Sequence, residues 1–151
     1  MSARVTVALV LVGLAGSSCV PGRCEGGFRM LLPDGEPAPV VVSADAAFWI
    51  NADASDRSAE ALLADSGVDA TTFVLVGPSG AVAADVSAAS VTSAHSCASA
   101  ATFHLKPRAS LAAGEYTLVL RLDRVKWPAL LSGEVSTFEG ERALVRRYVV
   151  R

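Results

Sequence analysis

The sequence is poor in several residue types, and these shortages narrow the choice of function. Its 151 residues include three cysteines, two histidines and two methionines, and charged residues make up only 19%. Lys and Arg (13) nearly balance Asp and Glu (15), so no basic surface argues for nucleic acid binding. The longest apolar run, residues 5–14, is about half of what a membrane-spanning helix needs. The composition therefore disfavours nucleic acid binding and a transmembrane helix.

Catalytic motifs are lacking as well. Residues 77–80 (Gly-Pro-Ser-Gly) do not have the G-x-S-x-G spacing of a nucleophile elbow, and they lie between two expected strands. We therefore interpret Ser79 as a turn residue. Four aspartates between residues 53 and 69 do not follow the spacing of a calcium-binding EF-hand loop and are interpreted as cap and surface residues. The sequence predicts a protein that is not an enzyme and has no cofactor.

The first nineteen residues have the three-part order of a bacterial export signal. Arg4 supplies the positive charge, residues 5–14 the apolar segment, and residues 15–18 the small side chains that precede Cys19. Gly-Ser-Ser-Cys at 16–19 resembles a lipobox, which implies that residues 1–18 are a signal peptide and that Cys19 carries lipid such as palmitate. Cleavage after Ser17 is the alternative, because Ala-Gly-Ser at 15–17 also fits the small-x-small rule.

These features predict a protein held at the cell envelope by a lipid anchor in the membrane. A periplasmic or secreted protein is the alternative, if cleavage follows Ser17 instead. Removal of residues 1–18 also removes Arg4, which leaves 12 basic against 15 acidic residues and a net charge of about −3.

The cysteine count bears on the lipid hypothesis, because three cysteines leave one over after any disulfide. If Cys19 carries lipid, Cys24 and Cys97 remain as a pair, and an oxidising compartment favours a disulfide between them. Such a bond would stabilise the fold by roughly 3–5 kcal/mol by closing a long loop. A free thiol at Cys97 is the alternative.

The mature chain of about 130 residues is long enough for one hydrophobic core. We expect a flexible N-terminal lead over residues 19–39, rich in Gly and Pro, followed by one domain over residues 40–151. Short apolar segments separated by turn residues recur through this domain, which is typical of an all-β sandwich. The expected strands are 40–43, 47–51, 72–76, 81–86, 101–106, 115–123, 134–138 and 143–150.

Alternation predicts which side chains of these strands face the core. In the segment 115–123, every second residue is large and apolar, which marks a half-buried strand. The expected inward row is Tyr116, Leu118, Leu120 and Leu122. The same pattern in 101–106 places His104 on the solvent side. Residues 143–150 alternate poorly and contain arginines, so an edge strand guarded against aggregation is expected there.

One segment has a helical rather than a β pattern. Residues 57–65 are rich in Ala and Leu, with Ser55 or Asp56 as the expected N-cap and Gly67 as the terminator. We expect a short crossover helix between the two sheets that packs Leu62 or Leu63 against the rim of the core. Residues 77–80 are expected to form a tight hairpin turn.

Residues 111–118, Leu-Ala-Ala-Gly-Glu-Tyr-Thr-Leu, resemble the L-x-x-G-x-Y turn of immunoglobulin-like (Ig-like) sandwiches, in which a tyrosine hydroxyl bonds upstream backbone. Together with the segments 33–42, 47–50, 68–75 and 103–107, this pattern resembles the bacterial Ig-like domain first described in surface-layer proteins. The resemblance implies an antiparallel sandwich of seven to eight strands that serves as a spacer, adhesive or binding module. Residues 51–56 depart from the family pattern.

The function predicted from these observations is that of a non-enzymatic binding or structural module of the envelope. An envelope protein or a polysaccharide would be its partner, and the apolar stretch with Trp127, Leu130 and Leu131 is a candidate partner patch. The other tryptophan, Trp49, is expected to pack over the sandwich. The alternative function is periplasmic copper or zinc binding through His95 and His104, with Cys97 between them, since imidazole and thiolate suit both metals.

Overall fold

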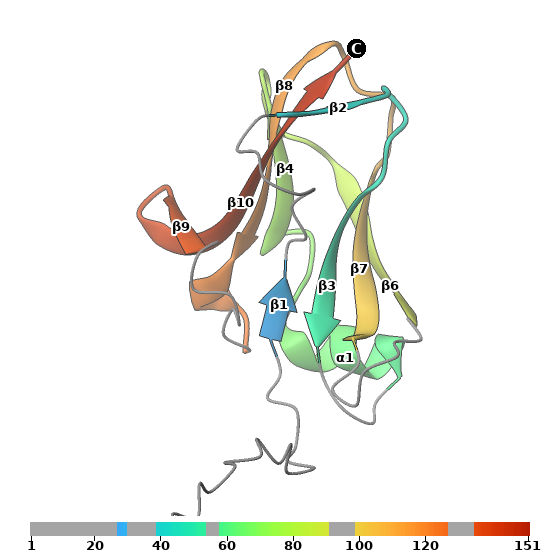
Figure 1. Ribbon diagram of the computed structural model, residues 1–151, viewed down its shortest axis with the longest axis vertical. Helices are drawn as coiled ribbons and strands as arrows, with labels where there is room; N and C mark the ends of the chain where they lie inside the picture. The colour runs from blue at the N-terminus through green and yellow to red at the C-terminus, as the bar shows by residue number, and fades with distance from the viewer. Residues whose placement is uncertain (1–26, 30–38, 54–57, 91–98, 127–134) are drawn as a thin grey trace, which may run out of the picture.

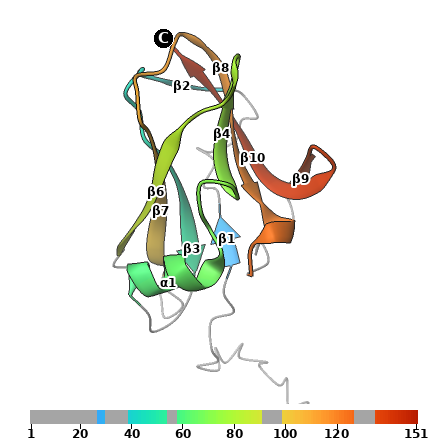
Figure 2. The same ribbon diagram turned by 180° about the vertical axis from the view of Figure 1, so that it is seen from behind.

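The computed structural model describes residues 27–29, 39–53, 58–90, 99–126 and 135–151, with Gly27–Arg29, Asp53, Ser99 and Ala100 described by their backbone alone. These residues form two stacked β-sheets and one α-helix. Figures 1 and 2 show the helix lying across one end of the two sheets, with the C-terminus at the opposite end. The architecture is an all-β sandwich with one short helix, as the spacing of the apolar segments predicted.

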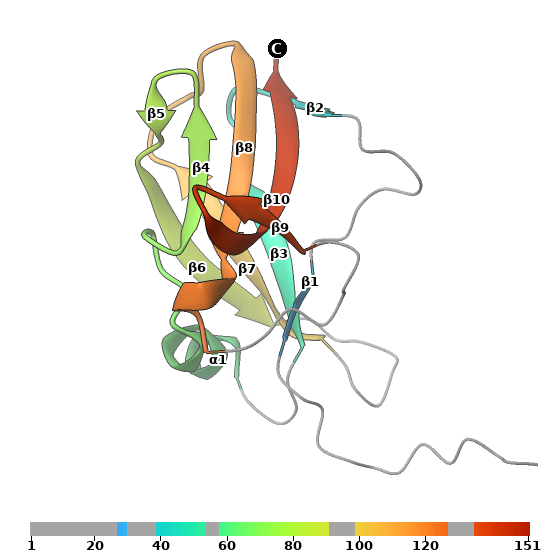
Figure 3. The same ribbon diagram turned by 90° about the vertical axis from the view of Figure 1, so that its left-hand side faces the viewer.

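The described strands divide into a four-stranded and a six-stranded sheet (Figure 3). The four-stranded sheet has the order β1 (Gly27–Arg29), β3 (Phe48–Asp53), β7 (Ser99–Pro107), β6 (Ala84–Ser90). The six-stranded sheet has the order β2 (Val40–Val42), β10 (Glu141–Val150), β8 (Gly114–Arg121), β4 (Phe73–Gly77), β5 (Gly80–Ala81), with β9 (Val135–Phe138) also paired to β10. All described pairs are antiparallel except β2 with β10, which is parallel.

The core lies between the two sheets, where every second residue of the long strands points inward. Tyr116, Leu118 and Leu120 of β8 are buried, which confirms the inward row expected from alternation. From the facing sheet, β3 and β7 contribute Phe48, Ile50, Phe103 and Leu105, each at most 1% exposed. Burying large apolar side chains from both layers is what holds two such sheets together.

β8 ends sooner than expected. The strand stops at Arg121, and Leu122–Arg124 forms a short 3₁₀ turn instead of continuing the sheet. Leu122 is still buried in the core, because the turn directs its side chain between the sheets. The expected burial of Leu122 is therefore confirmed, although its expected place in a strand is wrong.

The helix α1 (Ala59–Ser66) links β3 of one sheet to β4 of the other, as expected of a crossover. Leu62 is fully buried, and Leu63 packs partly buried against the core. The expected N-cap at Ser55 or Asp56 is wrong, because the side chain of Ser58 caps the helix by accepting a hydrogen bond from Ala61 N–H. Gly67 ends the helix at φ 76°, a left-handed conformation that glycine adopts without strain.

The expected strand 81–86 is divided between the two sheets. Ala81 belongs to β5, which pairs with β4 across the tight turn of Pro78 and Ser79, so the expected hairpin is confirmed. Val82 N–H still donates to Leu75 O in the six-stranded sheet, whereas Ala83 O accepts from Arg108 N–H beside the four-stranded sheet. The chain therefore changes sheets between two adjacent residues, which an apolar pattern does not reveal.

The final strand, β10, lies inside its sheet rather than at an edge. It pairs with β8 along one side and with β9 and β2 along the other, so the expected edge strand is wrong. Arg146 points to the same side as Leu144 and Tyr148 and is only 8% exposed, with its guanidinium 5.8 Å from the centre of the Tyr148 ring. This arginine is part of the interior and not a guard against aggregation.

A strand also forms within the segment expected to be a lead. Gly27–Arg29 forms β1, which pairs antiparallel with Asn51, Ala52 and Asp53 of β3. Its three residues are too few to produce a recognisable alternation, so sequence periodicity did not indicate it.

Candidate functional site

Most residues singled out from the sequence lie outside the described part of the chain. This applies to the signal peptide 1–18 and to the following site residues: Cys19, Cys24, His95, Cys97, Trp127, Leu130 and Leu131. The lipid anchor, the disulfide and the apolar patch therefore remain predictions from the sequence. None of the described helices is long and apolar enough to cross a membrane.

His104 lies on the outer face of the four-stranded sheet, as expected. It stands opposite Trp49 of β3 on one side and Ser87 of β6 on the other, and it is half-buried. Within the described ranges no group of three or more His, Cys, Asp or Glu residues is placed to hold a metal ion. The metal hypothesis also requires His95, and that residue is not described.

Trp49 is exposed rather than packed. Its side chain is 44% accessible on the outer face of the four-stranded sheet, because Phe48 and Ile50 on either side of it point into the core. Next to this row, Thr102 Oγ1 donates a hydrogen bond of 3.1 Å to Asn51 Oδ1 across the strands. Among the described residues, the outer face thus carries the indole of Trp49 next to the polar side chains of Asn51, Thr102 and His104.

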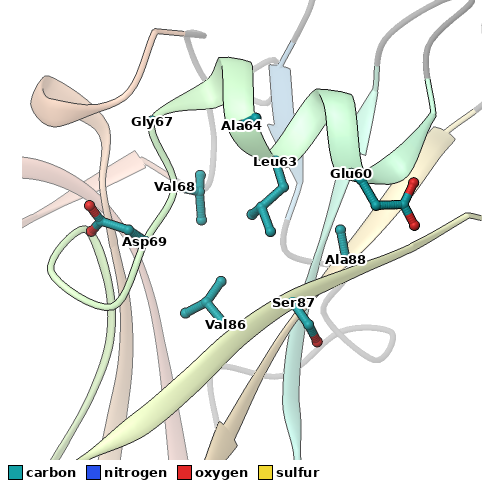
Figure 4. Close-up of a pocket in the computed structure, with 9 residues that line it drawn as sticks. All are labelled: Glu60, Leu63, Ala64, Gly67, Val68, Asp69, Val86, Ser87 and Ala88. Atoms are coloured by element: carbon teal, nitrogen blue, oxygen red, sulfur yellow. The ribbon is translucent and has the colours of Figure 1, made fainter.

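Among the described residues, a groove lies between α1, the loop that follows it and strand β6 (Figure 4). Its volume of about 540 Å³ falls within the range of sites that bind small ligands or side chains. Leu63 and Val68 reach into it from α1 and the loop, and Val86 and Ala88 from β6. The groove forms because α1 lies across the end of the sandwich and leaves the inner side of β6 partly uncovered there.

Two carboxylates mark the ends of the groove. Glu60 lies at the α1 end and Asp69 at the loop end, with both side chains directed away from the apolar middle (Figure 4). The described lining includes no Lys or Arg. Glu60 makes no ion pair with any described residue, so its charge is not neutralised within that part of the chain.

Asp69 is held in place by the turn that precedes β4. Its Oδ1 accepts hydrogen bonds from Thr71 N–H at 2.7 Å, Thr71 Oγ1 at 2.7 Å and Thr72 N–H at 3.0 Å. The bond from the Thr71 hydroxyl, followed by that from the Thr71 backbone, keeps the pKa of this carboxyl below its ordinary value. Asp69 is therefore ionised at neutral pH, and its Oδ2 accepts no hydrogen bond from a described residue.

Strand β6 is the edge of the four-stranded sheet next to this groove, and within the described chain only β7 pairs with it. In antiparallel sheets, alternate residues direct their N–H and C=O groups toward the partner strand. The bond from Arg108 N–H to Ala83 O places Asp85, Ser87 and Ala89 in the bonded set. Val86 and Ala88 therefore direct their backbone groups toward the open edge.

A second hollow is polar, and its charged groups are already occupied. It lies around residues 44–46 and 106–110. Arg108 forms an ion pair of 2.7 Å with Asp85, and Lys106 Nζ donates to Asp45 O. Ser110 Oγ donates to the Asp45 carboxylate. The contacts of Asp45 join the loop before β3 to the end of β7, and the pair of Arg108 with Asp85 joins that end to β6. We interpret these contacts as structural.

A third charged cluster anchors the β9–β10 hairpin. Arg121 pairs with Glu139 at 2.6 Å and Glu141 at 3.2 Å, and its guanidinium lies 5.4 Å from the centre of the Phe138 ring. Arg124 also pairs with Glu141. Because these charged groups are paired with one another, we interpret the cluster as structural: it holds the β9–β10 hairpin against the end of β8.

Comparison with known proteins identifies no relative of this chain. It matches no protein-family model, no curated protein and no solved structure. The groove was not anticipated from the sequence either. Its position depends on the angle at which α1 crosses the end of the sandwich, and no motif encodes that angle.

Proposed function

We propose that this protein is an exported, lipid-anchored envelope protein whose Ig-like sandwich acts as a non-enzymatic binding or structural module. The proposal combines the signal and lipobox pattern at Cys19 with the chain path of the sandwich. The observation that carries it is the order of strands in the two sheets, supported by one hydrogen bond at the start of β8.

The strand order supports the Ig-like part of the proposal. Ig-like sandwiches place strands A, B, E and D in one sheet and C, F and G in the other. Here β1, β3, β7 and β6 occupy the A, B, E and D positions, while β4, β8 and β10 occupy C, F and G. The parallel strand β2 adds to the G position, so the first strand of the fold is shared between the sheets.

The corner before β8 supports the same interpretation. Tyr116 is buried, and its hydroxyl donates a hydrogen bond of 2.9 Å to the carbonyl of Ala112, four residues upstream. A tyrosine near the start of strand F that bonds back to upstream backbone is the tyrosine corner of Ig-like domains. The L-x-x-G-x-Y pattern predicted this contact.

A module of this kind acts through its surface, and the described chain offers an open groove for a partner. The groove has an apolar middle, charged ends and an unpaired sheet edge beside it. These are the properties of a binding surface, whereas a purely structural spacer requires none of them. We therefore favour the binding role over the structural one.

The intact mass of the protein purified from its native host tests export and anchoring. The expected species begins at Cys19, carries lipid and is two hydrogens lighter than the fully reduced form, because Cys24 and Cys97 are joined. Replacing Cys19 with Ser is expected to abolish lipidation, while Ser79→Ala, in an exposed turn, leaves it unchanged. An unprocessed chain that begins at Met1 and remains in the cytosol would refute the proposal.

A further inference from the structure

We propose that the groove between α1 and β6 binds an extended peptide that adds a strand to the open edge of β6, placing an apolar side chain in the groove and basic residues near its ends. The inference rests on the proposed binding function and assigns it a surface and a class of partner. Three independent properties of the site support it.

The first property is the apolar middle of the groove. Leu63, Val86 and Ala88 are partly exposed there, and Val68 forms the buried floor. Apolar surface of this kind gains free energy when a partner covers it. The volume of about 540 Å³ is open on one side, so a side chain carried by an extended peptide can enter without rearrangement of the sandwich.

The second property is the backbone edge of β6. Val86 and Ala88 direct their side chains into the groove and their backbone N–H and C=O groups toward the open edge. Ser87 lines the groove although its side chain points away from it, so it contributes backbone (Figure 4). Exposed strand edges of this type pair with added strands, and side-chain pockets beside them provide selectivity.

Within the described part of the chain, the edge also lacks the usual protection against pairing. Natural edge strands carry Lys, Pro or a bulge that prevents unwanted partners from adding. From Ala84 to Ser90 the only charged residue of β6 is Asp85, and Arg108 already neutralises it. The remaining side chains are small, apart from Val86, and leave the backbone accessible. A binding function explains why this edge is left open.

The third property is charge, and it selects the partner. Glu60 and Asp69 stand at the two ends of the groove, with no Lys or Arg in the described lining. A peptide lying along β6 passes both carboxylates, so basic residues on either side of its apolar residue are attracted. A second copy of this chain would bring the same two carboxylates against themselves. Charge therefore favours a basic peptide over self-association.

The test uses the full chain purified from its host in a non-ionic detergent, with detergent alone as the blank. The probe is a fluorescent peptide of alternating Lys, Val, Lys, Ile, Lys, Val, Lys, followed by fluorescence anisotropy at low salt. Saturable binding is expected. A peptide with Glu in place of Lys, and one with Ser in place of Val and Ile, are each expected to bind at least about tenfold more weakly.

Two variants locate the site. Ala88→Pro removes an N–H that faces the open edge and is not part of the β6–β7 ladder, so the fold is retained and peptide binding is lost. Glu60→Lys is expected to weaken binding by about fivefold at low salt, while Glu115→Lys, an exposed residue on the other sheet with the same change in charge, leaves it unchanged. Circular dichroism confirms that each variant is folded.

Three outcomes would overturn the inference. They are no binding at about 1 mM peptide, binding that neither variant weakens, and dimerisation of the chain that Ala88→Pro abolishes. The last outcome would identify a second copy as the occupant. Failure of the peptide to bind while the intact mass shows a processed, lipidated Cys19 would reject this inference and leave export and anchoring intact.

Discussion

The ring of Tyr116 lies directly against the backbone of Gly77. A Cβ atom added at Gly77 would stand 2.4 Å from Cε1 and 2.8 Å from Cδ1 of the tyrosine, closer than carbon atoms approach without displacement. Gly77 ends β4 and begins the turn to β5, so one glycine allows both the hairpin and the tyrosine corner to occupy the same region. Because Gly77 has no side chain, the β4–β5 hairpin can pack against Tyr116, about forty residues further along the chain.

Replacing Gly77 with Ala is therefore expected to destabilise the sandwich. The added methyl group displaces the Tyr116 ring, and overpacking of this kind costs about 1–3 kcal/mol in the free energy of unfolding. Urea denaturation followed by circular dichroism measures the effect. In a Tyr116→Leu background the same substitution should be nearly neutral, because the ring is gone. Equal losses in both backgrounds would show that the contact is not responsible.

The hydroxyl of Tyr116 has its own contribution. Tyr116→Phe keeps the ring and removes the donor to Ala112 O, so we expect a loss of about 0.5–1.5 kcal/mol. Tyr148→Phe is the matched control, since the hydroxyl of Tyr148 bonds no described residue. Thermal unfolding of both variants distinguishes them. Equal stability of the two variants would mean that the corner bond is not a significant stabiliser.

Much of the fold was predictable because burial on one side of a strand produces alternation in the sequence. Alternation predicts the inward row Tyr116, Leu118 and Leu120, whereas the short helix around Leu62 is predicted by its Ala- and Leu-rich segment and by Gly67 at its end. Alternation reports which face is buried but not which strands are neighbours. Poor alternation and the arginines in residues 143–150 therefore predict an edge strand, although pairing on both sides places β10 inside its sheet.

The groove was less predictable for a related physical reason. Its lining comes from α1, the loop after it and β6, which are brought together only by the crossing of the helix over the end of the sandwich. Individually, Leu63 and Val86 look like ordinary partly buried residues. Only the strand order shows that β6 is an edge, and only the bond from Arg108 to Ala83 shows which backbone groups face outward.

Neighbouring aromatic residues in β3 should differ strongly in their effect on stability. Phe48 is 1% exposed and packs edge-on against Tyr148 at 4.8 Å, so Phe48→Ala is expected to cost about 3–5 kcal/mol. Trp49 is 44% exposed, and Trp49→Thr, which keeps a strand-favouring residue, should cost less than about 1 kcal/mol. Chemical denaturation compares the two. Similar losses would contradict the outward placement of Trp49.

The N-cap of α1 provides a prediction about the wall of the groove. Ser58→Ala removes the acceptor for Ala61 N–H and should reduce stability by about 0.5–2 kcal/mol. Ser58→Asp retains an acceptor and should preserve it. Hydrogen exchange of the α1 amides is the direct measurement, since loss of the cap is expected to speed exchange in the first turn. Unchanged exchange in Ser58→Ala would assign the cap to another residue.

Acid should weaken the link between the 3₁₀ turn and β10. Asp123 accepts hydrogen bonds from Arg142 N–H at 2.9 Å and Arg142 Nε at 2.8 Å, and the backbone bond is the main reason that its pKa is lowered. A lowered pKa in the folded state means that this stabilisation is complete above the ordinary aspartate value of about 3.9 and is lost as the pH falls through the folded-state pKa.

We expect Asp123→Asn to be less stable than the wild type at pH 6, with the difference shrinking below about pH 4. Urea midpoints measured from pH 6 to pH 2 follow this change. The pKa values of Asp69 and Glu141 are also lowered, but both residues are present in the two proteins. Only the contribution of Asp123 therefore differs between them. A gap between the two proteins that stays constant over this range would show that the charge of Asp123 does not contribute.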